Sequence, residues 1–297
     1  MVEQVLVDTA GGRKWTLDEP ADLGVDEPVT FILNLHGGGS VGAWQRAYFP
    51  ASDLVDRYRL VVAAPSAATR APIRYWSADA ADAHLRAVAE QVFDRYGRDR
   101  IASFWLAGHS QGGMTSHRLL NDPWWRDRVD GFLSLSGGRF GPVEVPESFF
   151  APHRAAGYQL PANFRTAARP GATVPDGLDI SFIFTTGEHE AMGVPDTSIL
   201  AERYGAGPRE RRDDVVDDQP GKIHDTRYGD RSTPAWGMLP GPGRAEVYAY
   251  PDAANGRLVA DVVRINKGHT EGLEPNVTEA LVRMMVEAPG GRARTAA

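Results

Sequence analysis

The stretch from Ile101 to Gly113, IASFWLAGHSQGG, decides the fold. Its start, Ile101–Ala107, is a near-continuous apolar run, which is typical of a strand buried on both faces of a parallel sheet. Its end contains Gly-x-Ser-x-Gly, the tight strand-to-helix turn that exposes a serine hydroxyl. Residues 112–120 then have helical spacing, and the helix is expected to stop before Pro123. This strand–turn–helix unit predicts that Ser110 is a nucleophile.

Similar units recur along the chain. Short apolar runs alternate with segments of helical periodicity, such as Asp79–Tyr96, which indicates βαβ units and a largely parallel sheet. A chain of 297 residues, 42% of them hydrophobic, is long enough for one large α/β domain over residues 1–297. The predicted strands are 29–35, 60–64, 101–107, 131–135, 180–185, 245–250 and 259–265.

Two segments do not fit this alternation. Residues 139–179 are rich in proline, glycine and aromatic residues, and residues 198–243 contain a run of charges and two Pro-Gly turns. Long irregular stretches in a compact domain are usually functional loops. We expect both to be insertions over the active-site edge of the sheet, where open α/β sheets bind their ligands.

Composition excludes several classes of function. The net charge of −7 repels phosphate backbones and anionic lipid surfaces, which argues against nucleic-acid and membrane partners. No apolar run reaches the length of a membrane-spanning helix, and the N-terminus lacks the features of a signal peptide. We therefore expect a cytoplasmic protein, with a secreted mature form left open. The absence of cysteine excludes disulfides and thiolate catalysis.

A second Gly-x-Ser-x-Gly match, around Ser40, follows the apolar run 29–35. It is the weaker nucleophile candidate because Val41–Pro50 shows no clear helix. The glycines before Ser40 better suit an oxyanion loop, since backbone without side chains can approach a substrate closely. We expect the N–H groups of Gly38 and Gln111 to stabilise the oxyanion.

The base and the acid follow from chain order, which in this fold runs serine, acid, histidine. Among the histidines, His269 lies far enough along the chain, beyond the acid candidates, to be the base that deprotonates Ser110. His224 lies in the charged segment, and His109 is expected to pack or to orient the turn. The acid candidates follow the strand 180–185: Glu188, Glu190 and Asp196. Metal binding by the first two with His189 is disfavoured, because alternating strand residues face opposite ways.

The assembled motifs resemble the polyhydroxybutyrate depolymerase and feruloyl esterase-like branch of the α/β-hydrolases, from about Val29 to Glu287. The motifs that carry the resemblance are Leu35-His36-Gly37-Gly38, Ala64-Pro65-Ser66, Tyr75-Trp76, Asp79 to Asp82, Gly108 to Gly113, Val194-Pro195 and Gly268-His269-Thr270. The family places its acid three residues after a glycine and shortly before Val-Pro, which points to Glu190. The usual residue there is aspartate and the spacing is one residue longer, so Asp196 stays the alternative.

The resemblance implies a mostly parallel central sheet flanked by helices, with loop insertions over the active site. It also implies hydrolysis of carboxylic esters through an acyl-serine intermediate, on small aryl esters or short polyesters, with no cofactor and no metal. Trp44, Tyr75 and Trp76 follow strand ends and are the candidate substrate-lining residues. A serine peptidase and a non-catalytic ligand-binding homologue are the alternatives. The sequence does not give the oligomeric state.

Overall fold

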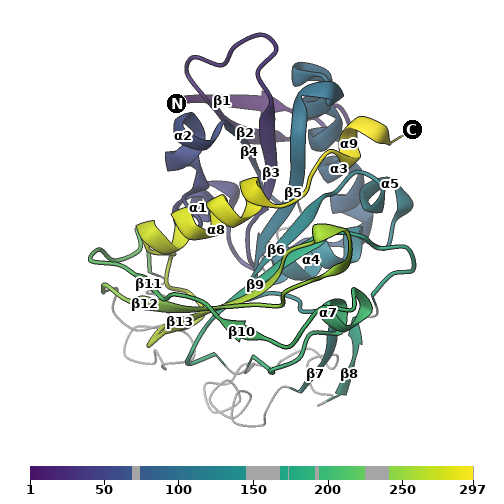
Figure 1. Ribbon diagram of the computed structural model, residues 1–297. Helices are drawn as coiled ribbons and strands as arrows, with labels where there is room; N and C mark the ends of the chain where they lie inside the picture. Colours follow the sequence, from purple (N-terminus) through teal and green to yellow (C-terminus); the bar gives the residue numbers. More distant parts are fainter. Residues whose placement is uncertain (69–73, 145–167, 173, 191–193, 225–240, 297) are drawn as a thin grey trace.

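The computed structural model describes residues 1–68, 74–144, 168–172, 174–190, 194–224 and 241–296, with the remaining segments drawn in grey in Figure 1. In these residues eleven strands form one sheet, and two more form a small antiparallel pair. In spatial order the large sheet contains β1 Val2–Val7, β2 Lys14–Glu19, β4 Leu60–Pro65, β3 Val29–Leu35, β5 Ile101–His109, β6 Gly131–Leu135, β9 Ser181–Gly187, β13 Val259–Ile265, β12 Arg244–Ala249 and β10 Glu210–Arg211, with β11 Val215–Val216 also on β12. The pair is β7 Gly141–Glu144 with β8 Ala168–Ala172.

The centre of the large sheet is parallel and its two edges are antiparallel. The strands β4, β3, β5, β6, β9 and β13 run in one direction, so their carboxyl ends meet at one edge. The β1–β2 hairpin pairs antiparallel to β4, and β12 pairs antiparallel to β13. Ser110, Glu190 and His269, the residues predicted to be nucleophile, acid and base, follow β5, β9 and β13 at the edge where the parallel strands end.

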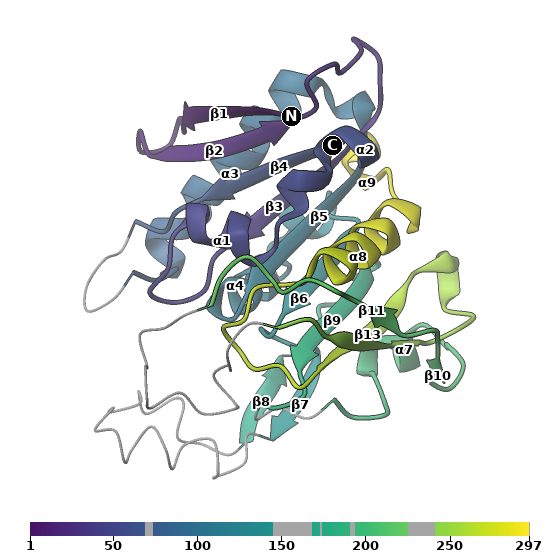
Figure 2. The same cartoon turned by 90° about the vertical axis from the view of Figure 1, so that its left-hand side faces the viewer.

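Helices cover both faces of the sheet (Figures 1 and 2). One hydrophobic cluster lies under α3, α5, α7 and α9, and the other lies under α1, α2 and α8. No helix in the described ranges is both long enough and apolar enough to cross a membrane. The helices are α1 Gly42–Tyr48, α2 Val55–Tyr58, α3 Ala78–Tyr96, α4 Gln111–Leu119, α5 Pro123–Arg126, α7 Ile199–Arg203, α8 Pro275–Glu287 and α9 Arg292–Thr295.

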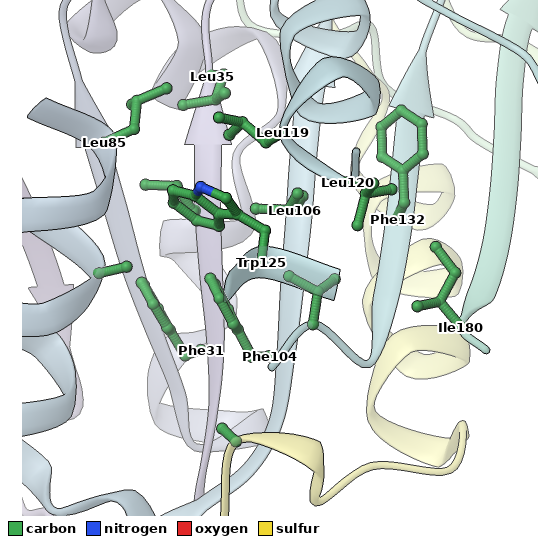
Figure 3. Packing of buried hydrophobic residues seen from close by; sticks show 14 of the residues in the cluster. Phe31, Leu35, Leu85, Phe104, Leu106, Leu119, Leu120, Trp125, Phe132 and Ile180 are labelled. Carbon is green, nitrogen blue, oxygen red and sulfur yellow. The ribbon is translucent and has the colours of Figure 1, made fainter. Parts of the chain in front are cut away.

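Aromatic rings fill the core between the sheet and α3 (Figure 3). Phe31 of β3 stacks on Phe104 of β5 with ring centroids 4.5 Å apart, and Phe93 of α3 meets both rings edge-on. Trp125 of α5 closes the cluster beside Phe104 and is 1% exposed. This packing joins β3 and β5, and the predicted oxyanion loop and nucleophile follow these two strands.

The predicted α/β class and all seven predicted strands are confirmed, with small shifts at their ends. The long helix predicted at 79–96 is α3, and its predicted apolar face packs on the sheet. The N-terminal β1–β2 hairpin was not predicted. Within the segments expected to be irregular, β7, β8, α7, β10 and β11 are regular structure. Whether these segments cover the active-site edge stays a prediction, because residues 145–167 and 225–240 lie outside the described residues.

Candidate active site

Ser110 occupies a strained turn between β5 and α4. Its backbone has φ 51° and ψ −116°, a left-handed conformation that costs a residue with a side chain of order 1–3 kcal/mol. The turn is tight because Gly112 lies against the end of β3, where a Cβ would collide with the carbonyl oxygen of Leu35. Strain of this kind is concentrated at functional sites, and here it exposes the serine at the start of the helix.

Ser40 does not share the backbone conformation of Ser110, although the prediction that no helix follows Ser40 is wrong. The segment after it does form a helix, α1, which begins at Gly42. However, Ser40 is not among the residues with positive φ, and its hydroxyl oxygen is buried without a hydrogen-bond partner in the described chain. Its backbone N–H closes a turn onto the carbonyl of Gly37 at 3.2 Å. Backbone geometry therefore separates the two serines more sharply than the presence of a helix.

The glycine loop after β3 lies directly against the nucleophile. An added Cβ on Gly37 would be 2.8 Å from Nδ1 of His109 and 3.3 Å from the Cβ of Ser110, so glycine allows the loop to lie this close. The N–H of Gly39 is taken by the carbonyl of Arg74 at 2.7 Å. Gly38, between them, was predicted to be an oxyanion donor, and that role stays a prediction.

Gln111 links the second predicted oxyanion donor to the segment after β4. It is the first residue of α4, where backbone N–H groups have no partner within the helix. Its side-chain oxygen accepts the N–H of Trp76 at 3.2 Å, and the Trp76 indole N–H donates to the carbonyl of His36 at 2.8 Å. Together with the bond between Gly39 and Arg74, these bonds connect both the glycine loop and the start of α4, which carry the two predicted donors, to the segment around Trp76.

His269 and Glu190 form the expected base–acid pair. The Nδ1 of His269 donates to Oε2 of Glu190 at 2.8 Å, and the carboxylate side chain is 4% exposed. Asp196, the alternative acid, is 86% exposed and forms its ion pair with Arg209 instead. Between the two candidates, the geometry favours Glu190.

Glu190 is held as an ionised carboxylate by three donors. Its Oε1 accepts the Ser136 hydroxyl at 2.5 Å and the N–H of Gly187 at 2.8 Å, which leaves Oε2 for His269. Burial alone would raise the pKa of Glu190, but the neighbouring His269 and these hydrogen bonds outweigh it and keep the pKa below its usual value. A carboxylate in this state can orient the base and stabilise its imidazolium form.

The acid loop and the base loop are joined by several hydrogen bonds. Glu188 N–H donates to the carbonyl of Arg264 at 2.9 Å, and His189 N–H donates to that of Lys267 at 3.0 Å. In return, Asn266 N–H donates to the Glu188 carboxylate, and the Asn266 side-chain oxygen contacts the His189 ring, both at 2.8 Å. Glu188 and His189, which the sequence offered as acid and metal candidates, therefore join the two loops. Among the described residues no group of three or more acidic, His or Cys side chains could hold a metal ion.

A buried network of ion pairs and hydrogen bonds holds the base loop, which is the loop around His269. Arg264 and Glu274 are each 2% exposed and pair through two contacts of 3.0 and 3.1 Å. Arg264 also donates to the carbonyl of Glu271, whose own carboxylate accepts the N–H of Gly268 at 2.7 Å. Lys267 adds a contact to Glu274 at 3.1 Å. This network fixes the backbone on both sides of His269.

The aromatic candidates separate into two groups. Trp44 is half-buried and stacks on Tyr48 with centroids 5.0 Å apart, beside the His109 ring, which places it near the triad. Tyr75 is also half-buried. Trp76 is 3% exposed and packs in the core, and its role in lining the substrate stays a prediction.

Neither of two cavities in the structure is lined by Ser110. One of about 680 Å³ lies between α8 and the edge strands β10 to β12, and one of about 180 Å³ is lined by Gly187 and Glu188 behind the acid loop. Glu190 and His269 line neither cavity.

Residues 30–215, more than half of the chain, match the family model described as the alpha/beta hydrolase fold. The chain is an α/β hydrolase. An acetyl xylan esterase from Aspergillus awamori is similar to it in structure, with a TM-score of 0.55 and 11% identity over 96% of this chain and 100% of that chain. Est1E from Butyrivibrio proteoclasticus, solved with ferulic acid bound, gives a TM-score of 0.49 and 13% identity over 95% of this chain and 98% of that chain. No curated protein matches the sequence.

These likenesses bear on the fold of this hydrolase alone, so the resemblance to one esterase branch stays a prediction. Sequence reasoning missed three residues that contact Glu190 or the loop of His269: Ser136, Tyr48 and Arg264. Ser136 follows the carboxyl end of β6 and has φ 53°, so its place after a buried strand was a usable signal. Arg264 interrupts an apolar strand, which also marks a buried charge. Tyr48 gave no signal, because its contact with His269 joins segments 221 residues apart.

Proposed function

We propose that this hydrolase is a serine carboxylesterase that cleaves small acyl, aryl or short polyester substrates through an acyl-Ser110 intermediate. One observation carries the proposal: His269 is hydrogen-bonded to Glu190 at 2.8 Å, and its main-chain carbonyl contacts the side chain of His109, the residue directly before the strained turn at Ser110. A carboxylate-oriented imidazole that reaches a partly exposed serine is the arrangement that activates a hydroxyl for acyl transfer.

In the acylation step, Nε2 of His269 takes the proton of Ser110 as the oxygen attacks the ester carbonyl. Glu190 holds the proton on Nδ1, so the correct ring nitrogen faces the serine, and its charge stabilises the imidazolium. The imidazolium then gives its proton to the leaving alcohol oxygen as the carbon–oxygen bond breaks. The acyl group remains on Ser110.

Deacylation repeats these steps with water as the nucleophile. His269 takes a proton from water, hydroxide adds to the acyl carbonyl, and the proton returns to Ser110 as the carboxylic acid leaves. In both steps the oxyanion would lie against the N–H groups of Gly38 and Gln111. Loss of one such donor costs roughly 100- to 1,000-fold in rate in comparable enzymes.

The position of Trp44 favours substrates that contain an aryl or an apolar acyl group. Its ring is half-buried, and its centroid lies 5.5 Å from that of the His109 ring. His109 directly precedes the proposed nucleophile. Its stacking on Tyr48 fixes the plane of the indole. A fixed aromatic surface beside the nucleophile favours flat or apolar groups over charged ones.

The test is turnover of p-nitrophenyl esters from acetate to decanoate by wild type, Ser110→Ala, His269→Ala and Ser40→Ala. We expect the first two variants to lose turnover and Ser40→Ala to retain most of it. Peptide anilides serve as comparison substrates, since a peptidase would prefer them. Wild-type inactivity on all esters, or an active Ser110→Ala variant, would contradict the proposal.

A further inference from the structure

The side chain of His109, which lies directly before the turn at Ser110, contacts two further loops of the site. Nε2 of its ring lies 2.8 Å from the carbonyl oxygen of His269, in the base loop. Its Nδ1 faces the oxyanion loop, where an added Cβ on Gly37 would be 2.8 Å away. Its own backbone immediately precedes Ser110. One imidazole therefore lies where the nucleophile, the base and the oxyanion loop meet.

The hydrogen bond fixes the protonation state of this ring. A carbonyl oxygen only accepts, so Nε2 of His109 must carry the hydrogen. Its Nδ1 is buried and has no hydrogen-bond partner in the described chain. Burial and the nearby His269 keep the pKa of His109 well below its usual value, so the ring stays neutral. Because the buried Nδ1 contacts no proton donor in the described chain, we assign His109 no role as a second base.

The bonded carbonyl belongs to the catalytic base itself. Glu190 holds the His269 side chain at one end, and His109 holds its main chain at the other. Tyr48 adds a longer contact from its hydroxyl to the same carbonyl at 3.3 Å and packs its ring 4.0 Å from that of His109. With both ends held, the imidazole of His269 has little freedom to turn away from Ser110.

We propose that His109 is a positioning residue, whose Nε2–H bond to the His269 carbonyl ties the base loop to the nucleophile turn and so sets the distance between base and nucleophile. The inference rests on the proposed esterase function. It assigns His109 no contact with substrate and no proton transfer.

The amide side chains of Gln and Asn separate the hydrogen bond from the packing. The amide nitrogen of Gln takes a position similar to that of Nε2, whereas that of Asn corresponds to Nδ1 and does not reach the His269 carbonyl. His109→Asn should lower kcat by about 10- to 100-fold, the size expected when a reacting group is displaced by about 1 Å. KM should stay within about threefold, because substrate contacts are unchanged. His109→Gln should recover most of kcat.

His84 provides a matched control. It is also a buried histidine, 1% exposed and paired with Asp8 near the N-terminal hairpin, outside the contacts of the triad. His84→Asn should leave kcat unchanged while lowering stability. Urea unfolding is measured for all variants, and kinetics are measured at a temperature where each is folded. A loss of folded protein is thereby distinguished from a loss of kcat. Tyr48→Phe, which removes the longer contact, should lower kcat less than His109→Asn.

The outcomes distinguish the two proposals. If wild type hydrolyses esters and His109→Asn matches it in kcat, the inference fails and the esterase function stands. If Asn and Gln variants lose kcat equally, the hydrogen bond is not the cause and the inference also fails. If wild type neither hydrolyses esters nor reacts with a fluorophosphonate, the proposed function fails and takes the inference with it.

Discussion

Replacing Glu190 by glutamine changes one atom of the site and should abolish most of the activity. Oε1 accepts from both Ser136 and Gly187, so the amide keeps its oxygen there. Its nitrogen must then take the place of Oε2, 2.8 Å from Nδ1 of His269. Two donors cannot face each other, so the imidazole must move its proton to Nε2. In that tautomer His269 cannot accept the proton of Ser110.

The expected loss is large and confined to the chemical step. In the well-studied serine protease triad, the same acid-to-amide change lowers kcat about 10⁴-fold through the wrong tautomer. We expect a fall of roughly 10³- to 10⁴-fold in kcat, or about 4–5.5 kcal/mol of transition-state stabilisation. KM should change little, because Glu190 is buried behind the base.

The assay is p-nitrophenyl acetate turnover by Glu190→Gln beside Asp196→Asn. Asp196 is exposed and pairs with Arg209, so its variant should keep at least half of the wild-type kcat. Urea unfolding checks that both variants are folded. A Glu190→Gln variant within tenfold of wild type, or an inactive Asp196→Asn, would refute the assignment of the acid.

Three further predictions concern stability. Burial lowers the pKa of His36 to about 4, so as the pH falls the unfolded protein binds a proton at this residue before the folded protein does. The free energy of unfolding should therefore drop by up to about 3 kcal/mol between a pH above 6.5 and a pH below 4. Urea titrations at several pH values should show a shallower pH dependence of stability in His36→Gln than in wild type, and equal slopes would contradict this. Gly112→Ala should cost about 1–3 kcal/mol from its backbone collision, measured by urea unfolding against Gly241→Ala, where a Cβ meets open space; equal stability of the two variants would oppose the prediction. Glu274→Leu leaves Arg264 buried without its carboxylate and should cost about 3–5 kcal/mol by the same method; a loss below about 1 kcal/mol would count against the network.

The central sheet and the tight turn at Ser110 were predictable because each rests on a local pattern. A buried parallel strand is an apolar run, and a nucleophile turn has its glycines at fixed positions around Ser110. His269 followed from chain order. The helix after Ser40 was missed because α1 has only seven residues and takes its stability from packing, in which Tyr48 is buried, rather than from capping or propensity.

The supporting contacts were not predictable for a different reason. The contacts of Ser136 with Glu190 and of His109 with His269 join residues 54 and 160 positions apart in the chain. No periodicity links such positions, since only the folded sheet brings its strand ends together. Glu188 and Glu190 were likewise both acid candidates from the residues alone, and only the family resemblance pointed to Glu190. The fold separates them, because one carboxylate meets the backbone of Asn266 and the other meets the base.

The most direct test of the central claim is to map the site of covalent labelling by a fluorophosphonate. Wild-type protein is labelled, digested with trypsin, and the adduct is located by fragment-ion mass spectrometry within the peptide 101–118, which contains Ser110. The account predicts one adduct on Ser110, abolished in Ser110→Ala and much slowed in His269→Ala. No adduct on a folded wild type, or an adduct on Ser40 instead, would contradict it.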